Sequence, residues 1–166
     1  MPENSSRNVF STTSVYDRVL LHIAEISTAC NGACTFIVLG VLNSRVGNLV
    51  DYVENDYFNP HVNLLPDDYK YDVPLLRSSR DSVINTYGRN LIDFCKESSL
   101  RILNGRIGED AGIGDYTYVG HNGRSVVDYV LSSSDLIQHV EYVCICEPTI
   151  LSDHCSLRFS LRYGFQ

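Results

Sequence analysis

Two acidic residues and a histidine stand beside segments that otherwise have the character of β-strands. Asp153 and His154 are adjacent and come just before the strand-like run 156–161, whereas Asp128 interrupts the apolar run 125–131. A buried charge needs a partner, because an unpaired one is costly in an apolar setting. A carboxylate bonded to one imidazole nitrogen fixes the tautomer and directs the other nitrogen outward. The pattern predicts that Asp128 orients His154, and that this site can hold a divalent cation beside a phosphate.

Each of these residues also has an ordinary structural interpretation. Asp153 and His154 fit a turn, because Asp and Ser form turns freely and His tolerates partial burial. Asp128 could pair with an arginine as a structural ion pair, or face solvent on an edge strand. Asn43 follows an apolar run and could bond a phosphate oxygen, although Asn after Gly is also common in turns. Asn104 is interpreted here as a turn residue.

Composition indicates one globular domain and sets limits on its partners. The chain has 166 residues, of which 44% are hydrophobic and 20% are charged, as in ordinary globular domains. Its net charge is −7 and its Lys and Arg residues are scattered, which argues against tight non-specific binding to nucleic acid. We therefore expect any contact with nucleic acid to be weak. A metal-dependent phosphoesterase stays compatible, because bound cations offset local carboxylates.

Two further features bear on the cellular setting. No run approaches the roughly 18 apolar residues of a membrane span, and the first residues do not read as a signal peptide. We therefore expect an intracellular protein without a membrane role, with the nucleus and the cytoplasm equally open.

Most of the six cysteines lie in apolar segments, where Cys acts as a small buried hydrophobe. We expect reduced thiols and no zinc site.

The elements that must position these side chains follow from hydrophobic periodicity. Residues 1–13 are predicted to be a disordered polar leader, and residues 14–166 form the domain. A helix is expected over 15–26 with Ser14 as N-cap, because apolar residues recur on one helical face. The apolar run 35–39 predicts a buried strand that stops at Gly40.

The rest of the chain predicts a layered arrangement of helices and strands. Residues 44–82 contain several prolines and Asn-Asp steps and are expected to be irregular. His121–Arg124 carries the Asn-Gly signature of a hairpin. We expect a helix over 91–98 and strands over 100–103, 116–119, 125–131, 139–146 and 156–161. This order favours an α/β fold with a mixed sheet.

Taken in order, these segments resemble the C-terminal part of the endonuclease/exonuclease/phosphatase superfamily. The resemblance is closest to the endonuclease domains of non-long-terminal-repeat retrotransposons and the proteins derived from them, such as craniofacial development protein 2-like proteins. The segments that carry it are 36–47, 90–95, 100–105, 117–118, 125–131 and 152–154. They span nearly the whole chain from Val15 onward.

The resemblance implies a partial two-sheet sandwich flanked by helices, of the DNase I-like kind, with a Mg²⁺-dependent site that cleaves phosphodiesters. By this match His154 would contact the scissile phosphate and help to activate water, and Asp128 would orient His154. Asp153 would lie at the metal or water site. Asn43 would hold the phosphate or the nucleophile.

The chain departs from the family pattern in two respects. The family has Gly-Asp-Phe/Leu-Asn after its apolar strand, whereas this chain has Gly40-Val41-Leu42-Asn43. Valine can neither accept a proton nor bind a cation, and such a loss commonly lowers a rate by about 10²–10⁴. The family's N-terminal half, which supplies a metal-binding Glu, has no counterpart here. We therefore expect a partly filled Mg²⁺ site, since Mg²⁺ needs several oxygen ligands.

These observations favour a truncated domain of retrotransposon origin, with weak or absent phosphodiester cleavage. A working phosphodiesterase completed by another chain stays open, because Asp128, Asp153 and His154 are all present. The alternative is a non-catalytic protein-interaction module derived from the same fold. In that case a partner protein would cover an exposed sheet face, or bind the tyrosine-rich segment 52–71.

Overall fold

The computed structural model describes residues 12–54 and 72–162, and the chain divides into two compact units after Cys34. The first unit contains helix α1 (Thr12–Ala29). The predicted helix over 15–26 is confirmed, but it begins before Ser14, which therefore lies inside it and is not its N-cap. Most of the predicted leader 1–13, and most of the tyrosine-rich segment 52–71, lie outside the described residues.

The second unit is built around a three-stranded antiparallel sheet. Its strands are β1 (Ile37–Val41), β5 (Asp128–Ser133) and β2 (Leu100–Ile102), in the order β1-β5-β2. The prediction that β1 stops at Gly40 is wrong. Gly40 has a φ of 148° and pairs with Tyr129, a backbone angle that glycine tolerates without strain. The strand therefore reaches Val41, which matters for the site described below.

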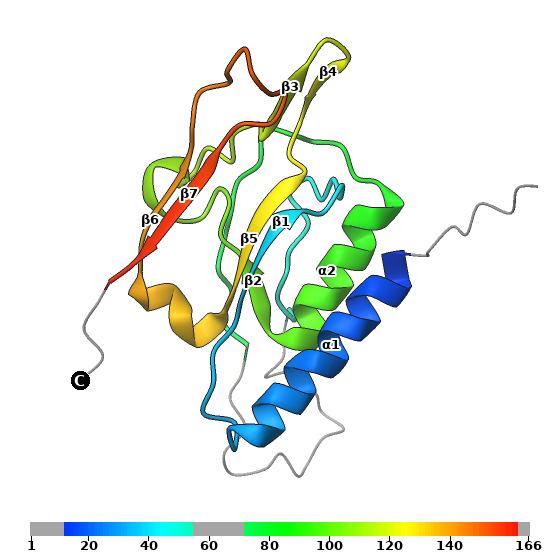
Figure 1. Cartoon of the computed structure of the whole chain (residues 1–166), viewed down its shortest axis with the longest axis vertical. Coiled ribbons are helices and arrows are strands. Elements are labelled where there is room, and N and C mark those ends of the chain that lie inside the picture. The colour runs from blue at the N-terminus through cyan, green and yellow to red at the C-terminus, as the bar shows by residue number, and fades with distance from the viewer. Residues whose placement is uncertain (1–11, 55–71, 163–166) are drawn as a thin grey trace, which may run out of the picture. The chain divides into compact units, whose positions relative to one another are not determined.

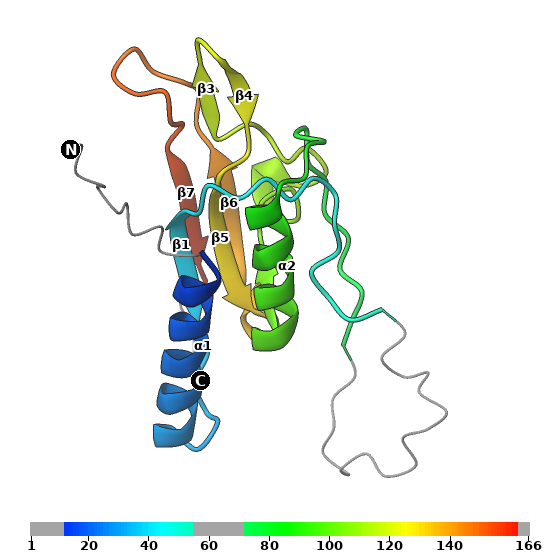
Figure 2. The same cartoon turned by 90° about the vertical axis from the view of Figure 1, so that its right-hand side faces the viewer.

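Layers cover both faces of this sheet. Figure 1 shows the sheet between helix α2 (Thr86–Ser98) on one side and the hairpin of β6 (Val140–Ile145) and β7 (Leu157–Leu161) on the other. Figure 2 shows the same strands from the side on which α2 lies. Alternation along the strands places one set of side chains against each layer.

The hydrophobic core joins the sheet to the hairpin. Leu103 and Val130 form a buried cluster with Val140 and Val143. The opposite face of the sheet packs on α2, whose buried side chains include Leu91, Ile92, Phe94 and Cys95. This helix begins earlier than the predicted residue 91, because the side chain of Asn85 accepts a hydrogen bond from the N–H of Gly88 at 2.7 Å and caps it.

The strand expected over 125–131 is two strands. Strands β3 (Tyr118–Gly120) and β4 (Gly123–Ser125) form a hairpin, which confirms the Asn-Gly prediction. The chain then leaves the ladder at residues 126–127 and starts β5 at Asp128. Asp128 therefore opens a strand, where a charged side chain can reach the sheet's end, instead of lying in the middle of one. Figure 1 shows the β3–β4 hairpin at the end of the sheet where β1 finishes and β5 starts.

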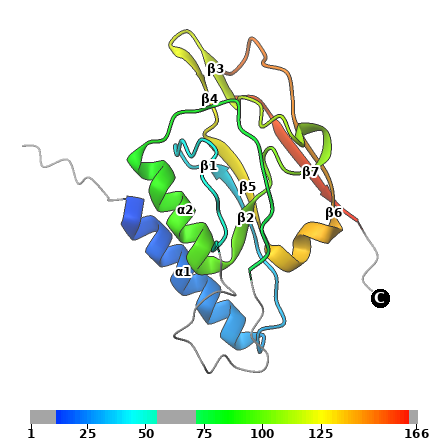
Figure 3. The same ribbon diagram turned by 180° about the vertical axis from the view of Figure 1, so that it is seen from behind.

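The irregular connection between β1 and α2 is held against the sheet by arginines. Residues 44–54 and 72–85 contain no helix or strand of their own beyond the isolated bridge of Val46 with Ile84. Asp51 forms a buried ion pair with Arg106 at 2.7 Å, and Asp72 pairs with Arg101. Figure 3 shows this connection running past β2. The predicted irregularity is confirmed for the described parts, and buried ion pairs take the place of regular hydrogen bonding.

The fold is therefore mixed α/β with three small antiparallel sheets and two 3₁₀ helices, Gly108–Asp110 and Ser134–His139. Every ladder among the described residues is antiparallel, so the expected mixed sheet is not found there. No helix in the described ranges is long and apolar enough to span a bilayer.

Candidate functional site

Asp128 and His154 lie side by side at the end of the sheet. The Nδ1 atom of His154 is 2.9 Å from Oδ2 of Asp128 and 3.1 Å from Oδ1. The imidazole is 40% exposed, whereas the carboxylate is only 12% exposed. When the carboxylate accepts a hydrogen bond from Nδ1–H, the other ring nitrogen, Nε2, is left for a ligand. It can be reached because the ring is partly exposed. The predicted contact is thus present, and we call this pair the dyad.

Val41 stands directly opposite Asp128. The two residues are register partners in the β1–β5 ladder, so their side chains point to the same face about 5 Å apart at Cβ. Val41 is 54% exposed. An apolar, solvent-accessible side chain therefore occupies the position next to the dyad where the resemblance leads one to expect a carboxylate.

Two buried polar side chains hold the backbone around Asp128. The amide of Asn104 donates to the carbonyl of Asp128 at 3.1 Å and accepts from the N–H of Val130 at 3.1 Å. The interpretation of Asn104 as a turn residue is therefore incomplete. Asp81 accepts from the N–H of Val126 at 3.1 Å and from Nε of Arg45 at 2.7 Å.

The Asp81 carboxylate is charged despite its burial. Burial by itself would raise the pKa of Asp81, but the Arg45 guanidinium and the N–H groups of Val126 and Val83 outweigh it and hold the pKa below its usual range. Asp81 therefore remains an acceptor at neutral pH, and the chain just before Asp128 stays anchored.

Asp153 contacts Tyr118 and, within the described part of the chain, forms no hydrogen bond with Asp128 or with the His154 ring. Its carbonyl accepts from the N–H of Val119 at 2.8 Å, and its Oδ2 is 3.5 Å from the hydroxyl of Tyr118. The Tyr118 ring also meets the His154 ring edge-on, with centroids 5.3 Å apart and an interplanar angle of 70°. Asp153 thus faces β3, while the next residue faces β5.

Asn43 lies in the irregular segment that follows β1, with a φ of 50°. Its carbonyl accepts from the Asn85 side chain at 3.5 Å. Within the described part of the chain, no hydrogen bond joins the Asn43 side chain to Asp128 or His154. The structure brings together two of the four predicted residues as a bonded pair and leaves Asn43 and Asp153 beside it.

The described residues do not by themselves fit a Mg²⁺ ion. Both carboxylate oxygens of Asp128 face His154, and the carboxylate of Asp153 faces Tyr118. Across residues 12–54 and 72–162, no group of three or more His, Cys, Asp or Glu side chains is arranged to hold a metal. Mg²⁺ requires near-octahedral oxygen coordination, which these side chains alone do not supply.

Cys155, the residue after His154, is not suited to act as a nucleophile. It is 6% exposed. Burial raises the pKa of the Cys155 thiol, and the nearby carboxylates of Asp115 and Asp128 raise it further. The reactive form of cysteine is the thiolate. The side chain at this position therefore contributes packing, and the chemistry of the site rests on the dyad.

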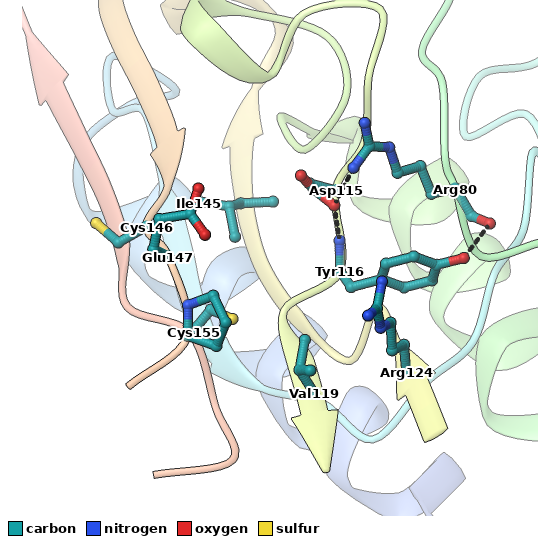
Figure 4. Close-up of a pocket in the computed structure, with 10 residues that line it drawn as sticks. Arg80, Asp115, Tyr116, Val119, Arg124, Ile145, Cys146, Glu147 and Cys155 are labelled. Carbon is teal, nitrogen blue, oxygen red and sulfur yellow. Dashed lines mark hydrogen bonds and ion pairs between the residues drawn. The ribbon is translucent and has the colours of Figure 1, made fainter. Parts of the chain in front are cut away.

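A pocket of about 270 Å³ lies next to Cys155, and sequence reasoning did not anticipate it. Neither member of the dyad lines it. Figure 4 shows Arg80 bonded to Asp115 at 2.8 Å, and the hydroxyl of Tyr116 donating to the Arg80 carbonyl at 3.1 Å. Arg124 and Glu147 also line the pocket, so charges of both signs face it and no ligand class is favoured.

Comparison with known proteins adds no family assignment. No protein-family model matches the chain, and no curated protein matches it in sequence. The dyad is therefore the feature of the molecule from which a function can be inferred.

Proposed function

We propose that this chain is a phosphodiester-binding protein derived from the endonuclease/exonuclease/phosphatase fold, with weak or absent hydrolysis. The observation that carries the proposal is the dyad, in which a buried carboxylate bonds Nδ1 of a reachable imidazole. In its protonated form, Nε2 of His154 donates to a phosphate oxygen. In its neutral form, the same atom accepts a proton from water.

Val41 favours binding of a phosphodiester over its cleavage. It lies across the ladder from Asp128, and its side chain offers neither an acceptor for the proton of a water molecule nor a ligand for a cation. Hydrolysis requires the water to be positioned and deprotonated beside the phosphate. An apolar group at this place leaves a site that can contact the phosphate while lacking that assistance.

We expect a phosphodiester to bind at His154 with a Kd on the order of 1 mM, since only a few polar contacts are available. The measurement is a titration of the ¹⁵N-labelled protein with the dinucleotide thymidylyl-thymidine, followed at the His154 ring. Thymidine alone is the matched control, because it lacks the phosphodiester. The ring signals should move with the dinucleotide and stay unchanged with the nucleoside.

A cleavage assay separates binding from hydrolysis. Supercoiled plasmid is incubated with Mg²⁺ and either the wild-type protein or His154→Ala, and the two nicking rates should differ by less than about tenfold, since hydrolysis is proposed to be weak or absent. Nicking by the wild-type protein that is faster than nicking by His154→Ala by about a hundredfold or more, about 2.7 kcal/mol in activation free energy, would show an efficient catalytic dyad and would overturn the hydrolytic part of the proposal. Unmoved His154 signals with the dinucleotide would overturn the binding part.

A second candidate function is a protein-interaction module, favoured by β1, whose outer edge pairs with no other strand among the described residues. Phe36 accepts a hydrogen bond from Ser133 at the end of β5, and Leu42 donates one to Val127, just before β5. The alternation of an antiparallel ladder therefore turns the backbone groups of Ile37, Leu39 and Val41 to the outer edge of β1. Leu39 is 61% exposed. An uncharged edge strand of this kind is a template for pairing with a strand of another chain.

For this second candidate we expect Leu39→Lys to abolish association in solution and binding of an apolar dye, since a charge on an edge strand opposes pairing. Leu76→Lys is the control, because Leu76 is also exposed (81%) but lies outside every strand. Size-exclusion chromatography and dye fluorescence give the two readouts. A wild-type monomer that binds no dye would remove this candidate.

A further inference from the structure

We propose that Thr117 is the positioning residue of the dyad, joining the strand that carries Asp128 to the segment that carries His154. This inference rests on the proposed function for its meaning, but its geometry stands independently. Thr117 is completely buried. It directly precedes β3, in a stretch of chain that lies between β4 and the residues around His154.

The hydroxyl of Thr117 holds the Asp128 side of the dyad. Its Oγ1 accepts from the N–H of Val127 at 2.9 Å and from the N–H of Asp128 at 3.0 Å. These donors lie at the interruption between β4 and β5, where the chain has left one ladder and is starting the next. A side-chain oxygen thus replaces the strand partner that these two N–H groups, one buried and one half-buried, would otherwise need.

The main chain of Thr117 holds the other side. Its carbonyl accepts from the N–H of Cys155 at 2.7 Å, and its own N–H donates to the carbonyl of Ser125 at 3.0 Å. The next residue, Tyr118, forms a bridge with His154 and places its ring edge-on to the imidazole. One residue therefore spans the gap between two segments that are 26 positions apart in the sequence.

The consequence is a specific function for the hydroxyl. It sets where β5 begins, and therefore where the carboxylate of Asp128 lies relative to Nδ1 of His154. Serine at position 117 keeps this acceptor. Valine has nearly the shape of threonine but no oxygen, so it leaves the N–H groups of Val127 and Asp128 without a partner. Thr117→Val is expected to shift the carboxylate away from the ring without emptying the core.

The test is the tautomer of His154, read from its imidazole ¹⁵N signals at a pH where the ring is neutral. The wild-type protein should show mainly the form protonated at Nδ1, because Asp128 accepts from that atom. Thr117→Ser should keep this form. Thr117→Val should move the population toward the form protonated at Nε2, and should weaken thymidylyl-thymidine binding at least about fivefold, the effect of losing one modest contact.

Two measurements keep the inference falsifiable and separate it from the proposed function. Unchanged His154 signals in a folded Thr117→Val variant would overturn the inference. If that variant does not fold, amide hydrogen exchange of the wild-type protein tests the inference instead. The N–H groups of Val127 and Asp128 should then be protected as strongly as the N–H of Tyr129 in β5. Rapid exchange at 127 and 128 would overturn it. A tautomer shift without any dinucleotide binding would keep the positioning role and refute phosphodiester binding.

Discussion

Replacing Asp51 with alanine is expected to destabilise the fold by about 3–5 kcal/mol, the usual effect of leaving a buried charge unpaired. The Asp51 carboxylate is fully buried, and it meets the guanidinium of Arg106 at 2.7 Å and 3.0 Å. It also accepts from the N–H of Ile102 at 2.7 Å. Alanine would remove the anion that pairs with Arg106 and the acceptor for the N–H of Ile102 in β2. Urea unfolding followed by circular dichroism gives the free energy.

An exposed ion pair supplies the control for this prediction. Asp115 pairs with Arg80 at 2.8 Å, with side chains 42% and 54% exposed. Solvent screens such pairs, so Asp115→Ala should lower the free energy of unfolding by no more than about 1 kcal/mol. Equal losses for the two variants would contradict the view that Asp51 anchors the irregular connection to β2.

The second large effect is expected for Gly105→Ala, at about 3 kcal/mol or more. Gly105 has a φ of 72°, and a Cβ added there would lie 1.9 Å from the backbone carbonyl oxygen of Ser78. The segments around Ser78 and Gly105 are also joined by a hydrogen bond from the Ser78 N–H to the Gly105 carbonyl at 3.1 Å. Alanine would force these segments apart, which thermal unfolding would report as a markedly lower Tm.

Gly112 is a matched control, because its φ is 74° and an added Cβ would meet no atom within 4 Å. Gly112→Ala should lower the free energy of unfolding by only about 1–2 kcal/mol, the cost of placing alanine at a left-handed backbone angle. The difference between the two variants isolates the steric overlap with Ser78. If Gly105→Ala lowers the stability no more than Gly112→Ala does, the loop at Gly105 can move to accommodate the added Cβ without strain.

These two stability predictions concern the parts of the molecule that support the dyad from a distance. Asp51 holds the irregular connection against β2 through Arg106 and Ile102, and β2 pairs with β5. Gly105 immediately follows Asn104, whose side chain bonds Asp128 and Val130. We therefore expect both substitutions to weaken ligand contact at His154 only as far as they unfold the protein.

The local elements could be predicted from the sequence because they depend on short-range patterns. Apolar periodicity predicted α1, α2 and the positions of most strands, but neither the break between β4 and β5 nor the exposure of Leu39 in β1, which was predicted to be buried. The Asn-Gly step predicted the β3–β4 hairpin. The pairing of Asp128 with His154 was also predictable. A carboxylate in an apolar run needs a partner, and the residue types near the chain's end offered an imidazole.

Register and the supporting contacts could not be predicted in the same way. Whether Val41 lies opposite Asp128 depends on β1 continuing through Gly40, and a one-residue shift would turn the side chain to the other face. The role of Thr117 could not be predicted from the local pattern, since its hydroxyl accepts from N–H groups ten and eleven positions away.

The sequence by itself determined the helices, the hairpin and the chemical character of the dyad, because periodicity, turn residues and buried charge act over short distances. Only the tertiary structure decided that Gly105 is crowded while Gly112 is free, that Asp51 holds β2, and that Thr117 joins the two halves of the dyad. Each of these depends on backbone atoms brought together from remote parts of the chain, and a residue's type does not specify which atoms those are.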